Sequence, residues 1–142
     1  VGNNAQLGRV LGLAPDQRFG EQDLGFAGPA AFDGAQALAD HVAQALGRAV
    51  TLVQPAARRI QRVAWCTGGA QGYFESAIAA GADAFITGEI SEPQAHLARE
   101  MGVAFIAAGH HATERYGAPA AAGLVAQQLG IEHHFVEIDN PA

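Results

Sequence analysis

The sequence predicts an α/β protein, a layered sheet of mixed or mostly parallel strands flanked by helices. From residue 60 onward, short apolar stretches alternate with helical stretches in units of roughly 20 residues, the pattern of parallel strands joined by helices. The short stretches are apolar throughout, as expected for strands buried on both faces of a sheet. The chain has 142 residues, the length of one ordinary domain, so we expect 1–142 to form a single α/β region.

The first half of the chain combines short apolar stretches with turns rich in Gly and Pro. Leu7, Val10 and Leu11 recur at the spacing of one helix face. Asn4 and Asp33 stand where each could cap a helix that follows. The elements expected here are a helix over 4–13, short strands around 17–19 and 24–27, a helix over 34–46 and a strand over 50–53.

The second half repeats a unit of strand, turn and helix. Pro55 and the pair Arg58 and Arg59 predict a loop before the first of these strands. Ser91 is placed to cap a helix that has Pro93 in its first turn. The elements expected here are strands over 60–66, 84–87, 103–107 and 133–138, and helices over 71–80, 92–100 and 119–129.

The composition argues against several classes of function. The net charge is −6 and no basic stripe is present, so binding of nucleic acid through its phosphates is not expected. The longest apolar runs are shorter than the ~20 residues of a membrane span, so we expect no contact with a membrane. Cys66 is the only cysteine, which excludes a disulfide within the chain and favours a cytoplasmic location. We expect Cys66 to be a buried, inert thiol rather than a nucleophile.

Three loops come directly after predicted strands and combine glycine with polar residues. They contain Gly68, Gly88 and Gly109. Ligands of open α/β sheets collect at the carboxyl ends of the strands, so we expect these loops to converge there. Glu89 lies in the second loop. It is open to interpretation as an acid–base group, as a group beside a ligand, or as a helix-capping or solvated carboxylate, and we favour the last.

The run GHHATE at 109–114 follows a buried strand and opens a helix. His110 and Glu114 are four residues apart, which places both side chains on one helix face, about 5–6 Å apart at Cβ. An imidazole and a carboxylate are good ligands for zinc, iron or manganese. The alternative is an ordinary solvent-facing pair, and two ligands do not complete a site. His111 points about 100° away around the helix and is a second ligand, a neighbour of one, or a proton shuttle.

Gly68 and Gly69 form the turn before a predicted helix. Small residues at such a place expose backbone N–H groups, and a helix N-terminus favours anions such as phosphate. The turn matches neither a P-loop nor a dinucleotide-binding fingerprint, and a tight strand-to-helix turn with no ligand is the alternative. Binding of an anion by Gly68 and Gly69 is therefore a secondary prediction, and the residues alone assign no catalytic group.

Several segments together resemble one family. They are GNNAQL at 2–7, VAWCTGGAQ at 63–71, GADAFITGE at 81–89, GHHATE at 109–114 and FVEIDNP at 135–141. In this order they are similar to the C-terminal portion of the GTP cyclohydrolase 1 type 2 homologue family, also called YbgI-like or Ngg-interacting-factor-three-like. The resemblance extends over essentially the whole chain. Family members are longer, which implies that this chain is a fragment of a larger two-unit α/β protein.

The resemblance also implies a centre of two metal ions. In the family its ligands are a His-His pair in the N-terminal half, an Asp near the middle, and the His and Glu of a Gly-His-x-x-x-Glu motif. The last two correspond to His110 and Glu114. The His-His pair has no counterpart here, and the Asp would lie upstream of Val1. We therefore expect truncation, and weak or absent metal binding by this chain alone.

The leading functional prediction is a metal-dependent hydrolase. The resemblance implies two divalent ions (zinc, iron or manganese) in the complete protein, and a nucleotide or a cyclic amide as the substrate. It also implies ring-like homo-oligomers, commonly hexamers. The main alternative is a non-catalytic oligomeric protein that binds metal or regulates a partner. A nucleotide-binding module without metal is the third.

Overall fold

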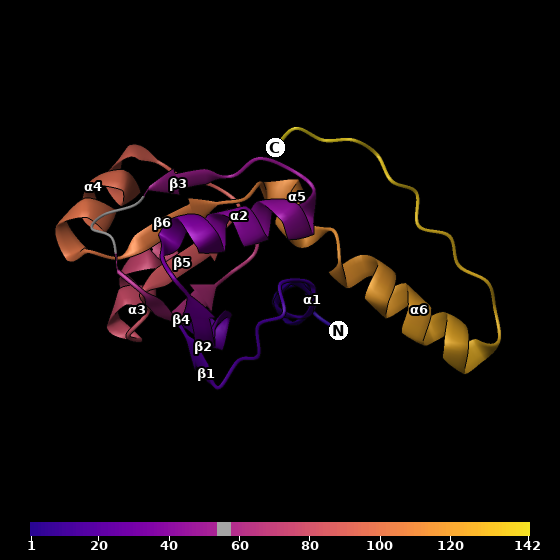
Figure 1. Ribbon diagram of the computed structural model, residues 1–142. Coiled ribbons are helices and arrows are strands. Elements are labelled where there is room, and N and C mark those ends of the chain that lie inside the picture. The colour runs from indigo at the N-terminus through magenta and orange to yellow at the C-terminus, as the bar shows by residue number, and fades with distance from the viewer. Residues whose placement is uncertain (54–57) are drawn as a thin grey trace.

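The computed structural model describes residues 1–53 and 58–142 (Figure 1). Its strands form one sheet in the order β1-β2-β4-β5-β6-β3. The central strands β4, β5 and β6 are parallel, whereas β1 and β2 on one side and β3 on the other pair antiparallel. This mixed sheet confirms the predicted fold class. The strands are β1 (Gln17–Phe19), β2 (Gly25–Phe32), β3 (Thr51–Val53), β4 (Ile60–Trp65), β5 (Ala84–Thr87) and β6 (Ala104–Ala107).

Helices cover both faces of the sheet, and two short 3₁₀ turns join its elements. Side chains of α1 and α2 pack on one face, and those of α3 and α4 pack on the other. The short helix α5 follows β6, and α6 extends away from the sheet (Figure 1). The helices are α1 (Asn3–Val10), α2 (Ala35–Leu46), α3 (Phe74–Ala79), α4 (Glu92–Met101), α5 (His110–Glu114) and α6 (Gly117–Leu129), with 3₁₀ turns η1 (Glu21–Asp23) and η2 (Gln71–Tyr73).

Alternate residues of the parallel strands build two separate cores. In β5, Ile86 faces the core formed with α1 and α2, whereas Phe85 faces the core formed with α3 and α4. Phe105 of β6 lies beside Phe85, with ring centroids 5.6 Å apart in an edge-to-face arrangement. The strands are therefore buried on both faces, as their continuous apolar sequences predict.

The predicted strand over 133–138 is wrong. Residues 131–142 contain neither helix nor strand, and they run from the end of α6 back to α5 (Figure 1). Alternating polar and apolar residues favour a strand only when a neighbouring strand accepts the backbone hydrogen bonds. Within the described residues the two edges of the sheet are formed by β1 and β3.

The predicted caps have mixed outcomes. Ser91 is the N-cap of α4, as expected, and its N–H donates to the side chain of Gln94 (3.2 Å). Asn4 lies inside α1 rather than at its cap, and Asp33 accepts a hydrogen bond from Arg59 instead of capping α2. Pro55, part of a predicted loop, lies outside the described residues. None of the helices in the described ranges is long and apolar enough to span a membrane.

Candidate metal site

The three glycine-containing loops meet at the carboxyl edge of the parallel strands. The N–H of Gly88 donates to the carbonyl of Gly68 (2.8 Å), and the N–H of Gly109 donates to the carbonyl of Gly88 (2.9 Å). The buried hydroxyl of Thr87 also donates to the carbonyl of Gly68 (3.1 Å). These bonds continue the hydrogen bonding of the sheet into the loops that follow its strands. The predicted convergence of the three loops at this edge is therefore confirmed.

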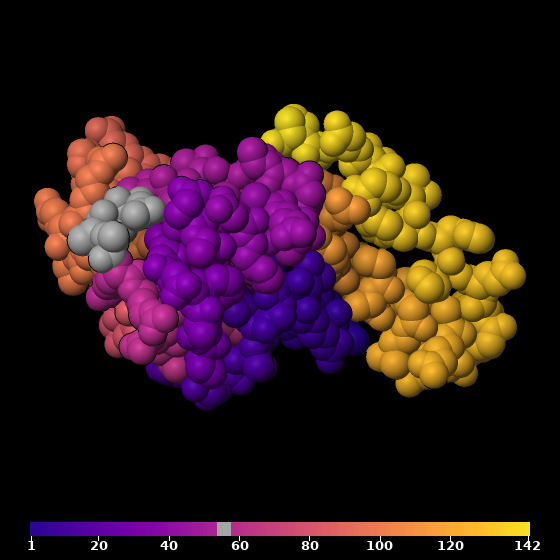
Figure 2. Space-filling model, in the orientation of Figure 1, coloured from indigo at the N-terminus to yellow at the C-terminus, as the bar shows by residue number. Residues whose placement is uncertain are grey.

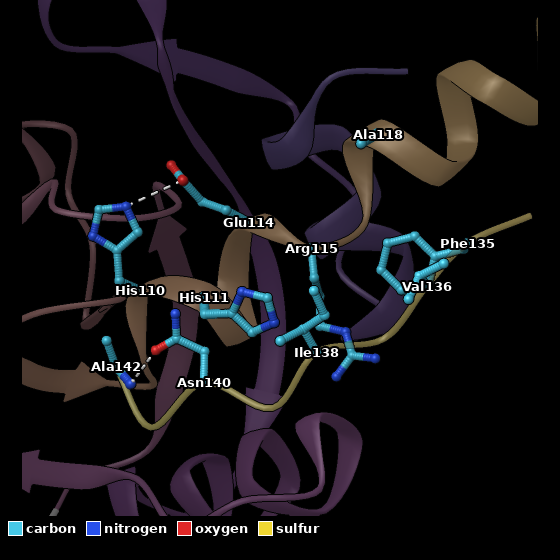
Figure 3. Close-up of a pocket in the computed structure, with 10 residues that line it drawn as sticks. All are labelled: His110, His111, Glu114, Arg115, Ala118, Phe135, Val136, Ile138, Asn140 and Ala142. Atoms are coloured by element: carbon cyan, nitrogen blue, oxygen red, sulfur yellow. Dashed lines mark hydrogen bonds and ion pairs between the residues drawn. The ribbon is translucent and has the colours of Figure 1, made fainter.

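His110 lies between two carboxylates. Its Nε2 is 3.1 Å from Oε2 of Glu114, and its Nδ1 is 2.5 Å from Oε1 of Glu89. The side chains are 42% exposed for His110, 40% for Glu114 and 46% for Glu89. Figure 3 shows His110 and Glu114 pointing toward one another from the same face of α5. The predicted contact across four residues is present and accessible from solvent.

The charges of this cluster affect its protonation. The hydrogen bond from His110 lowers the pKa of the Glu89 carboxyl, and the bond to Glu89 is the largest cause of a raised pKa for His110. Glu114 raises the pKa of His110 further. In the absence of a bound cation, the imidazole therefore holds a second proton to a higher pH than an isolated histidine does.

Gly68 and Thr113 fix the position of α5 against the first loop. The Thr113 hydroxyl, buried and on the inner side of α5, accepts the N–H of Gly68 (2.9 Å) and bonds to the carbonyl of Gly109 (2.9 Å). Gly68 has a φ of +69°, and a Cβ there would lie 2.2 Å from Oε1 of Glu114. Only glycine leaves room for the Glu114 carboxylate beside this turn.

The geometry gives no support to anion binding at Gly68 and Gly69. The N–H of Gly68 is already bonded to Thr113, and the turn lies against carboxylates. A Cβ on Gly69 would lie 3.3 Å from Oε1 of Glu89. Negative charge on both sides disfavours a phosphate, so anion binding here stays a prediction without support from the site.

His111 takes no part in the contacts of His110 with Glu89 and Glu114. It faces a cavity of about 420 Å³ between α5 and the C-terminal residues, and its Nε2 is 3.7 Å from a carboxylate oxygen of Glu137 (Figure 3). The three roles predicted for His111, a second ligand, a neighbour of one or a proton shuttle, stay predictions. The cavity is lined by His110, His111, Glu114, Arg115, Ala118, Phe135, Val136, Ile138, Asn140 and Ala142.

Two further residues have simple placements. Cys66 is buried, as expected, and burial raises the pKa of its thiol, which disfavours the reactive thiolate. Glu89 is neither a helix cap nor merely solvated, because its carboxylate contacts His110. Its position in one of three converging loops was the signal in the sequence, but the sequence could not show which side chain it reaches.

The donor set fits part of a metal centre. His110 and Glu114 bring an imidazole nitrogen and a carboxylate oxygen to one point, which suits zinc, iron or manganese. Across residues 1–53 and 58–142, no group of three or more His, Cys, Asp or Glu side chains is arranged to hold a metal ion. Two ligands are fewer than a catalytic ion normally requires.

Comparison with known proteins identifies the family. The model of the Duf34/NIF3 (NGG1p interacting factor 3) family matches residues 1–141. The chain therefore belongs to the Duf34/NIF3 family, and the predicted resemblance is confirmed.

The relatives are close in sequence and in structure. Proteins named GTP cyclohydrolase 1 type 2 homolog from Neisseria meningitidis and Pseudomonas aeruginosa are 51% and 50% identical over 145 and 146 residues, covering all of this chain. A solved structure of the protein ybgI, described as of unknown function, is 41% identical with a TM-score of 0.90 over 99% of this chain. A structure of TTHA1606 from Thermus thermophilus is 28% identical, with a TM-score of 0.85 over the whole chain.

This chain matches only part of each relative. It covers 57% of the Neisseria protein, 58% of the Pseudomonas protein and 57% of each of these two structures. The activity, substrates and assembly of the whole protein are therefore matters for proposal.

Proposed function

We propose that the whole protein is a metal-dependent hydrolase, and that His110 and Glu114 are two ligands of its metal centre. The observation that carries the proposal is the approach of His110 Nε2 to Glu114 Oε2 at 3.1 Å, at the ligand-binding edge of an α/β sheet. When the ring is neutral with its proton on Nδ1, two acceptor atoms face each other, and a cation between them satisfies both.

The residues of this chain have separate tasks in that site. His110 offers the lone pair of Nε2, and Glu114 offers a carboxylate that can contact one ion or two. Gly68 leaves the space beside Glu114 that any other residue would fill. The ligands are about two-fifths exposed, which lets water and a small substrate reach them. A bound pair of divalent cations would supply Lewis acidity to the hydrolysis.

The remaining ligands and the substrate belong to the whole protein. We expect a His-His pair and an Asp from residues outside this chain to complete a site for two ions of zinc, iron or manganese. The name shared by the relatives points to a guanine nucleotide, and a cyclic amide is the broader substrate class. We also expect a homo-oligomer, with a hexamer as the leading arrangement.

An assay of the whole protein tests this proposal. Hydrolysis of guanine nucleotides and cyclic amides is compared before metal removal, after removal by a chelator, and after addition of Zn²⁺, Mn²⁺ or Fe²⁺. We expect activity to follow metal, and the His110→Ala variant to lose both. His96→Ala is the matched control, because His96 forms a similar exposed pair with Glu92 on α4 (3.5 Å).

The outcomes separate the proposal from its alternatives. If His110→Ala removes metal and no substrate is turned over by any loaded form, the non-catalytic metal-binding or regulatory role is favoured. A whole protein that holds no metal would favour the nucleotide-binding module instead.

A further inference from the structure

Glu89 binds the ring nitrogen of His110 that faces away from Glu114. Oε1 of Glu89 is 2.5 Å from Nδ1, whereas Nε2 on the other side of the ring approaches Glu114. A neutral imidazole has one N–H and one lone pair, and an ionised carboxylate only accepts. Both ring nitrogens face a carboxylate, but the contact at Nδ1 is the shorter one, 2.5 Å against 3.1 Å at Nε2. We therefore place the proton of a neutral His110 on Nδ1, which leaves the lone pair of Nε2 toward Glu114.

Glu89 is itself held in place by its surroundings. Its second oxygen accepts a hydrogen bond from the Gln71 side-chain amide (3.4 Å), and its first lies against Gly69, where a Cβ would be 3.3 Å away. The preceding residue, Gly88, is tied by backbone bonds to both neighbouring loops. The carboxylate thus meets His110 from a backbone that is fixed on two sides.

We propose that Glu89 is a positioning residue, which fixes the tautomer and the ring orientation of His110 so that Nε2 is presented to a metal ion. This inference rests on the proposed function, since it assigns the direction in which His110 binds metal. Histidine ligands commonly donate their other N–H to a carboxylate, and loss of that partner costs about 10–100-fold in metal affinity.

A second pair in the chain shows what Glu89 adds. Glu92 and His96 on α4 have the same residue types at the same spacing, with 3.5 Å between Oε1 and Nε2. Both side chains are more exposed than those of His110 and Glu114, and within the described residues Glu92 is the only carboxylate that pairs with that ring inside 4 Å. Glu92→Gln is therefore a matched control for Glu89→Gln.

The test measures Zn²⁺ affinity of the whole protein by calorimetry for wild type, Glu89→Gln, Glu89→Ala and Glu92→Gln. We expect the dissociation constant to rise about 10–100-fold in both Glu89 variants and to stay within twofold in Glu92→Gln. Equal thermal midpoints of wild type and Glu89→Gln verify that the fold is intact. Zn²⁺ affinity within twofold of wild type in both Glu89 variants overturns the proposal.

A second measurement does not depend on metal. Nitrogen-15 NMR of the metal-free protein, at a pH high enough for a neutral His110, reports which ring nitrogen carries the proton. We expect the proton on Nδ1 in wild type, and a shift toward Nε2 in the Glu89 variants. An unchanged tautomer overturns the proposal even if affinity falls. A wild-type protein that binds no Zn²⁺ contradicts the proposed function, while the tautomer still decides the role of Glu89.

Discussion

In the sheet body, residues 3–53 and 58–107, large apolar side chains are buried against one another, whereas in the C-terminal arm, residues 117–142, most of them face solvent. Figure 2 shows the arm extending from one side of the body. The largest buried side chains include Trp65, Phe85 and Phe105, all in central strands. The exposed apolar residues of the arm are Leu124, Val125, Leu129, Ile131, Phe135, Val136 and Ile138.

Several polar contacts join the arm to the body. The N–H of Gly117 donates to the side chain of Asn3 (2.8 Å), and Arg115 pairs with Glu137. At the chain end, the carbonyl of Ala142 accepts the N–H of His111 (3.1 Å) and a guanidinium N–H of Arg48 (3.1 Å). Burial of large apolar side chains stabilises the body, whereas the partly exposed ion pair of Arg115 with Glu137 adds little to the attachment of the arm. The candidate site on α5 lies at the junction between them.

The largest expected effect comes from the body. Phe105 is fully buried and contacts the rings of Phe74 and Phe85. Phe105→Ala should lower the free energy of unfolding by about 3–5 kcal/mol, because it removes buried area and leaves a cavity. Val136→Ala in the arm, at a side chain 73% exposed, should change it by less than about 0.5 kcal/mol. Urea denaturation measures the free energy of unfolding of both variants. Similar losses in the two would contradict the contrast between a buried body and an exposed arm.

The second largest effect is expected at Gly68, beside α5 at the junction of the body and the arm. Gly68→Ala should cost about 1–2 kcal/mol for a left-handed backbone, and should also weaken Zn²⁺ binding, because the new Cβ displaces Glu114. Gly12→Ala is the control, since Gly12 has a φ of +68° and nothing lies within 4 Å of the position that a Cβ would take there. Thermal unfolding should respond alike in both variants, and calorimetry with the whole protein should show weaker metal binding in Gly68→Ala alone. Equal metal affinity in both would show that Glu114 does not need this space.

The smallest effect depends on pH. Arg62 binds both carboxylate oxygens of Asp16, at 2.7 and 3.2 Å, and this hydrogen bonding lowers the pKa of Asp16 below its ordinary value of 3.8. The stabilisation is therefore complete above that value and is lost as the pH falls through the lowered pKa. Asp16→Asn should be slightly less stable than wild type at pH 7, and the difference should shrink as the pH falls through the lowered pKa of Asp16.

The arm provides the control for that ion pair. Glu137→Gln removes the partner of Arg115 without touching the sheet, so the unfolding transition of the body should be unchanged at pH 7. Melting curves across the pH range compare the two variants. A larger loss from Glu137→Gln than from Asp16→Asn would show that the arm supports the body.

The parallel strands could be predicted from the sequence because burial on both faces requires apolar residues throughout each strand. The expected strand over 84–87 matches β5, and those over 60–66 and 103–107 differ from β4 and β6 by one residue at one end. The strand expected around 24–27 is shorter than β2, which extends from Gly25 to Phe32. Its strand continues through Pro29 to Phe32, across an irregularity in its pairing with β4 that tolerates the missing N–H of proline.

The site was predictable only in part, for a geometric reason. The contact of His110 with Glu114 follows from helix spacing alone. The contact of His110 with Glu89 depends on the relative position of the loops after β5 and β6 and on side-chain rotamers. No local sequence pattern encodes either. The failed strand over 133–138 has a similar cause, because a strand needs a neighbour that only the tertiary structure supplies.

The place of β3 at the far edge of the sheet has a consequence for the order of events during synthesis. Leu52 of β3 pairs with Ile106 of β6, although β4 and β5 lie between them in the sequence. At about 5–20 residues per second, a ribosome completes β6 roughly 3–10 s after β3. During that interval β3 has no strand to join, so the edge of the sheet closes only once the chain has been made through Ala107.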